Sequence, residues 1–152
     1  MSPRMNSPVM VVPDALPALL GLSKVISKAG LTQQTLDLVH LRASQINGCA
    51  GCIHLHARDL GKSKEMDERL LMAAAWREAR CFSDAERAAL ALAEAVTRIS
   101  DRANPVPDEV WEETARHYSE PELGALVLAI GLVNLWNRVN VSTRQVPGAE
   151  WS

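Results

Sequence analysis

The chain has 152 residues and a formal net charge of −2, with 47% apolar and 22% charged residues. This is the size and composition of one soluble globular domain. A net charge this close to zero does not predict binding to nucleic acid or to an anionic membrane surface. Three cysteines are too few for a secreted disulfide framework, and no uninterrupted apolar stretch has the length of a membrane span, so we expect a cytoplasmic protein.

The sequence predicts an N-terminal arm at residues 1–13, a helical domain at 14–145 and a C-terminal tail at 146–152. The first helix is expected from a cap at Asp14 to Ala29, before Gly30. A second opens at Thr32 and runs through Ile46. A third then carries a pair of cysteines and ends near Leu60, where Gly61 follows.

Four further helices are expected in the second half of the chain, at about 64–79, 83–99, 108–117 and 119–141. Ser83 to Glu86 and Ser119 to Glu122 have the spacing of capping boxes. No segment alternates with the period of a strand. The predicted fold class is therefore all-α, a compact bundle of about seven helices.

The last of these helices is apolar almost all round between Leu123 and Val133. A helix of this kind must be buried on most sides, and in so small a domain this predicts a homo-oligomer that covers part of it. The polar residues that follow it, Asn134, Trp136, Asn137 and Arg138, indicate a core or interface cluster without an assigned chemistry.

Cys49 and Cys52 are separated by two residues, and His56 follows Cys52 by one helical turn. On a helix these three side chains share one face. Gly48 is suited to end the preceding helix, which places Cys49 at a helix N-terminus, where the dipole favours a thiolate. We expect Cys52 beside His56 to attack an oxidant and Cys49 to close a disulfide with it. Cys81 is expected to be a structural thiol.

Asp37 is the expected acid partner of His56. An antiparallel pair of helices turning at Gly48 brings both residues to similar heights, although His40 and Arg42 on the same helix could take that role. Other interpretations stay open, because the two cysteines could be buried core residues or could bind zinc with His54 and His56. On a helix His54 points away from His56, so a zinc site would need a ligand from elsewhere.

The segment from Asp37 to Arg58, with its CxxCxxxH core, resembles the AhpD-like alkylhydroperoxidases of the carboxymuconolactone decarboxylase family. The resemblance continues in Ala74–Glu78, Phe82–Leu90 and Trp136–Arg138. Asp37 stands where that family has glutamate, and Gly51 stands where its best-studied branch has a histidine.

The resemblance implies an all-helical oligomer, a trimer or hexamer, that reduces organic hydroperoxides through its CxxC pair, without a cofactor. Electrons would come from a dithiol donor such as a dihydrolipoyl protein. The implied catalytic residues are Cys49, Cys52, His56 and Asp37. The alternative function is a non-peroxidatic thiol redox or metal-binding module that uses the same CxxC. Lactone decarboxylation is not expected, because the decarboxylases proper lack this cysteine pair.

Overall fold

The computed structural model describes residues 2–60 and 69–145, and within these ranges the chain is helical and contains no strand. The predicted all-α class is therefore confirmed. The elements in chain order are α1 (Pro8–Val11), α2 (Ala15–Ile26), α3 (Gln33–Asn47), α4 (Ala50–Leu60), the 3₁₀ turn η1 (Ala73–Ala75), α6 (Asp84–Thr97), the 3₁₀ turn η2 (Ile99–Asp101), α7 (Asp108–His117) and α8 (Glu120–Thr143).

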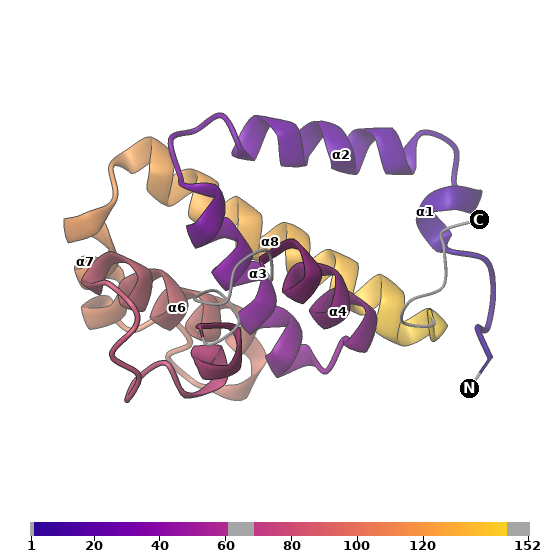
Figure 1. Cartoon of the computed structure of the whole chain (residues 1–152). Coiled ribbons are helices and arrows are strands. Elements are labelled where there is room, and N and C mark those ends of the chain that lie inside the picture. Colours follow the sequence, from indigo (N-terminus) through magenta and orange to yellow (C-terminus); the bar gives the residue numbers. More distant parts are fainter. Residues whose placement is uncertain (1, 61–68, 146–152) are drawn as a thin grey trace.

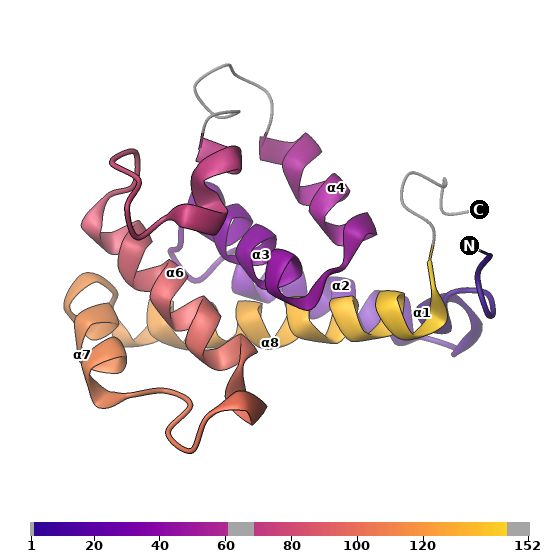
Figure 2. The same ribbon diagram turned by 90° about the horizontal axis from the view of Figure 1, so that it is seen from below.

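Helix α3 is the centre of the bundle and packs against α4, α6 and α8 (Figure 2). Helix α7 covers α6, and α2 lies along α8 (Figure 1). Helix α3 is buried over most of its length because Leu36, Leu38, Val39 and Leu41 are all almost inaccessible to solvent. They occupy two core clusters, one shared with α6 and α8 and the other with Trp76 and Phe82.

Most of the capping signals in the sequence form as predicted. Thr32 accepts a hydrogen bond from the backbone N–H of Thr35, and Gly48 ends α3 in the left-handed conformation with φ of 66°. Both capping boxes are present, at Ser83 with Glu86 and at the start of α8. These residues satisfy backbone groups that a helix end would otherwise leave unpaired.

Several predicted helix ends are wrong. Asp14 lies at the start of α2 but its side chain caps nothing, since its own backbone is left-handed. That helix ends at Ile26, before the turn to Gly30. The predicted helix 64–79 tightens into η1 and a turn instead of continuing to Ala79, and the next helix ends at Thr97. The arm contains α1. The predicted stop at Gly61, the start near Lys64 and the tail 146–152 lie outside the described residues.

Helix α8 is not buried on all sides. Its exposed face carries Gly124, Leu128, Gly131 and Leu135, while the opposite face contributes Leu126, Ala129 and Ile130 to the core. By length and mean hydropathy α8 alone among the described helices could cross a membrane, but half of its most apolar stretch is buried inside the protein. Its buried half is part of the hydrophobic core.

A buried carboxylate joins α3 to α6. Glu94 is only 4% exposed and pairs with Arg42 of α3 at 2.7 Å and with Arg77 at 2.7 Å. The indole N–H of Trp76 donates to it at 3.0 Å. Burial would raise the pKa of Glu94, but hydrogen bonds from two arginines and the indole outweigh it and lower the pKa to about 2. Arg42 is thus a structural residue.

Candidate active site

The turn between α3 and α4 places the first cysteine. Helix α4 folds back against α3 (Figure 2) because Gly48 reverses the chain in a conformation that other residues rarely adopt. Cys49 follows directly and stands just before α4, one position earlier than the predicted first turn. Its sulfur accepts a hydrogen bond from the backbone N–H of Cys52 at 3.4 Å, so the thiol position lies at the amino end of the helix.

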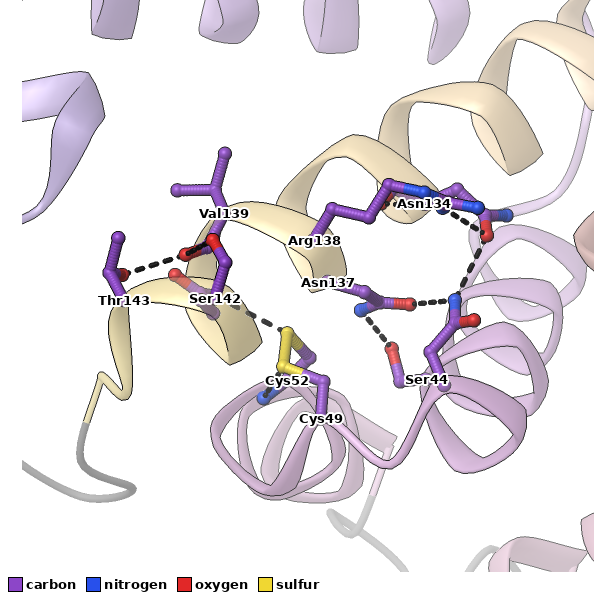
Figure 3. Close-up of a disulfide and its surroundings, with 11 residues drawn as sticks. Ser44, Cys49, Cys52, Asn134, Asn137, Arg138, Val139, Ser142 and Thr143 are labelled. Carbon is purple, nitrogen blue, oxygen red and sulfur yellow. Dashed lines mark hydrogen bonds between the residues drawn. A yellow bond between two sulfur atoms is a disulfide. The ribbon is translucent and has the colours of Figure 1, made fainter. Parts of the chain in front are cut away.

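Cys49 and Cys52 form a disulfide, with their Cα atoms 5.3 Å apart. Figure 3 shows the disulfide facing the C-terminal part of α8. Both cysteines are buried, at 2% and 5% exposure. Their burial is what the interpretation as core residues expects, and the two cysteines are also paired with each other.

A network of amides holds this turn against α8. Asn47 donates to the side-chain oxygens of Asn134 at 2.9 Å and Asn137 at 2.8 Å. Asn137 in turn donates to the hydroxyl of Ser44 at 3.0 Å (Figure 3). Asn134 and Asn137, which the sequence left without a role, therefore hold the disulfide turn against α8 through buried hydrogen bonds.

A cavity of about 420 Å³ opens beside the disulfide. Cys52 belongs to its wall and Cys49 does not. Helices α1 and α2 supply an apolar side of the cavity, α3 and α4 a polar one, and α8 closes it with Trp136 and Asn140. The size is typical of a small-molecule site, and the mostly apolar lining suits an organic ligand with one polar end.

The predicted acid and base reach this cavity together. Asp37 and His56 both line it, as does His40. Asp37 is 9% exposed and accepts a hydrogen bond from the side-chain amide of Gln33 at 2.8 Å. The antiparallel pair of helices thus brings Asp37, Cys52 and His56 to one site, as the sequence predicted.

His40 is a second imidazole of the site. Its ring centroid lies 5.1 Å from that of His56. Burial, and secondarily the charge of His56, lower the pKa of His40 to about 3. His40 is therefore a neutral imidazole at physiological pH, able both to donate and to accept a hydrogen bond.

The other sequence candidates lie away from the cavity. His54 is exposed, as expected for a surface residue. Cys81 is also exposed, so the expectation of a structural thiol is wrong; it lies in the irregular stretch before α6. Within residues 2–60 and 69–145, no three His, Cys, Asp or Glu side chains are grouped so that they could hold a metal ion.

Sequence reasoning missed Asn140, whose side-chain N–H donates to the sulfur of Cys52 at 3.4 Å. A signal was present: Asn134, Asn137 and Asn140 recur every three residues, which places them on one face of a helix. The spacing predicts a buried polar stripe on α8. Only the packing of α4 against α8 shows that its last member meets a cysteine.

Sequence comparison finds one matching family and a relative similar over most of its length. Residues 13–95 match the carboxymuconolactone decarboxylase family. The chain is 34% identical over 132 residues to YdfG of Bacillus subtilis strain 168, an alignment that covers 87% of this chain and 88% of YdfG.

Two solved structures share its architecture. A protein of unknown function from Agrobacterium tumefaciens, described as a candidate antioxidant defence protein AhpD, matches with a TM-score of 0.84 and 33% identity over 98% of this chain and 100% of its own. The debrominase Bmp8 matches with a TM-score of 0.79 and 24% identity over 90% of this chain and 73% of its own. At that identity the likeness to Bmp8 concerns the fold alone.

Proposed function

Because the chain belongs to the carboxymuconolactone decarboxylase family, we propose that it is a thiol-dependent peroxidase that reduces organic hydroperoxides through Cys52 and Cys49. One observation carries this proposal. Cys52 lines a mostly apolar cavity together with His56, His40 and Asp37, while Cys49, its disulfide partner, lies behind it. A thiol that is open to a ligand and backed by a second thiol has the arrangement that peroxide reduction needs.

The reaction balances with the residues of the site and one external dithiol. The Cys52 thiol transfers its proton to His56, and the thiolate attacks the outer oxygen of the hydroperoxide. The O–O bond breaks, Cys52 becomes a sulfenic acid, and the leaving alkoxide takes the proton from His56 to become an alcohol. The Cys49 thiol then displaces water from the sulfenic acid, and the disulfide forms. An external dithiol, such as a dihydrolipoyl protein, reduces it.

His40 supports this proposal because it supplies a second imidazole to the site, and this chain lacks the histidine that the best-studied branch of the family has next to its second cysteine. Gly51 stands in place of the histidine that the best-studied branch has before its second cysteine. His40, from the neighbouring helix, lines the same cavity and lies against His56. In the proposed mechanism Asp37 orients His56, directly or through water, and neutral His40 relays protons between His56 and the cavity.

The proposal extends to a homo-oligomer, a trimer or hexamer, and to a cytoplasmic location, where the reducing environment suits a dithiol enzyme. The exposed face of α8 supports the assembly. Leu128 is 50% and Leu135 39% exposed on it, and a Cβ added at Gly124 or Gly131 would meet no neighbouring atom within 4 Å. A helix of a second copy could approach such a face closely.

Rapid oxidation of the reduced protein tests the function. We expect cumene hydroperoxide to oxidise Cys52 faster than hydrogen peroxide does, because the cavity holds an apolar group. Cys52→Ser should abolish peroxide consumption, whereas Cys49→Ser should leave a sulfenic acid on Cys52 that a dimedone reagent traps for mass spectrometry. Oxidation no faster than that of free cysteine would refute the peroxidase and leave disulfide exchange as the function of the pair. Sulfenate confined to Cys49 in the Cys52→Ser protein would reverse the two roles.

A further inference from the structure

The side chain of Asn140 uses its amide nitrogen but not its amide oxygen. It is 7% exposed, and its Nδ2 donates to the Cys52 sulfur at 3.4 Å. Among the described residues its Oδ1 has no hydrogen-bond partner. Asn140 lines the cavity beside Cys52 and His56. An unpaired polar oxygen therefore belongs to a buried side chain in the wall of the site, next to the sulfur proposed to react.

The two other asparagines on this face of α8 are different. The side-chain oxygens of Asn134 and Asn137 both accept hydrogen bonds from Asn47. Leaving a buried carbonyl oxygen unpaired costs stability, and native proteins rarely tolerate it without a reason. Since the same helix face satisfies its other two amides, the buried and unpaired oxygen of Asn140 points to a partner that a ligand of the cavity supplies.

We propose that Asn140 is a catalytic residue that holds the peroxide against Cys52, with Nδ2 donating to the sulfur and Oδ1 accepting the O–H of a hydroperoxide. This inference rests on the proposed function. One planar amide would then fix the attacking sulfur and the attacked oxygen relative to each other. The oxygen that sulfur attacks is the one that carries the proton, so the same O–H remains bonded to Oδ1 when the sulfenic acid has formed.

The two halves of this role predict separate effects. An N–H donor favours a thiolate over a thiol, so its loss should raise the pH at which Cys52 becomes reactive. The neighbouring groups that also influence this pH are His56, His40 and Asp37, which line the same cavity. The acceptor contributes only when a hydroperoxide is bound, so its loss should slow oxidation even where Cys52 is fully ionised.

Asn140→Leu removes both groups at nearly constant volume. Thr143→Val is the matched control, because Thr143 is also buried on α8 and bonds to the helix backbone, but it does not line the cavity. Two measurements on the reduced proteins are needed: the pH profile of Cys52 alkylation by iodoacetamide, resolved from Cys81 by mass spectrometry, and the single-turnover rate with cumene hydroperoxide at a pH above the alkylation midpoint.

We expect Asn140→Leu to raise the alkylation midpoint by about one pH unit and to slow oxidation about ten- to hundredfold above it, while Thr143→Val changes neither. If Asn140→Leu does not fold, Asn140→Ala, which adds no bulk, should show the same two effects. Unchanged profile and rate in a folded variant would overturn the proposal, and a shifted midpoint with an unchanged rate would overturn its substrate half. If the wild type fails to react with peroxides, the proposed function fails, and the alkylation profile still decides whether Nδ2 stabilises the thiolate.

Discussion

His40 should make the protein sensitive to mild acid. It lies in the wall of the cavity against His56, and burial lowers its pKa from 6.5 to about 3. Between these two values the unfolded chain binds a proton at His40 and the folded protein does not. Stability from this residue is therefore fully present above pH 6.5 and is lost as the pH falls towards 3.

The size of the effect follows from the same values. A pH of 5.0 lies about 1.5 units below the pKa of His40 in the unfolded chain, so the unfolded histidine is protonated while the folded one is still neutral. The free energy of unfolding therefore falls by about 2 kcal/mol relative to pH 7.5. His40→Gln retains a polar side chain that does not titrate. The variant should lose about 2 kcal/mol less than the wild type over this interval.

Urea unfolding at pH 7.5 and 5.0 measures this difference. Both proteins should be compared at one concentration and with the disulfide intact, because a bound partner or an open disulfide changes the unfolding free energy. The contributions of His54 and His117, which do not line the cavity, are common to both proteins. Equal acid losses in wild type and variant, or an imidazole NMR signal of His40 that titrates near pH 6.5, would refute the inference that burial keeps this residue neutral.

Three further outcomes follow from the structure. His56→Ala should slow peroxide reduction by about 10²–10⁴-fold, whereas Asp37→Asn should cost less and Asp37→Glu should retain or raise the rate; equal rates in all variants would leave His56 as a packing residue. Glu94→Gln should lower the free energy of unfolding by about 3 kcal/mol, because it leaves the largely buried Arg42 without its carboxylate, while Glu113→Gln in an exposed ion pair should change it far less. Leu128→Arg, on the open face of α8, should shift the mass measured by light scattering towards the monomer, and a monomeric wild type at micromolar concentration would contradict the proposed assembly.

Local signals in the sequence predicted the helices well where the stabilising contacts are themselves local. Thr32, Gly48, Ser83 and Ser119 mark helix ends that the structure confirms, because a cap is decided by residues within one turn of each other. The end predicted at Ala79 is wrong for the opposite reason. There the chain turns where Trp76 reaches the distant Glu94, and no local pattern contains that contact.

The sequence by itself determined the all-α class, the turn at Gly48, the pairing distance of Cys49 and Cys52 and the position of His56 beside Cys52 on one cavity, since these depend on helical periodicity and on one glycine between two helices. Tertiary structure decided which side chains from other helices join them. Asn140 lies 88 positions beyond Cys52 in the chain, and His40 is a neutral member of the site only because packing removes it from water. Burial and contacts between distant segments depend on how the helices pack against each other, and the local pattern of residues along one helix does not reveal them.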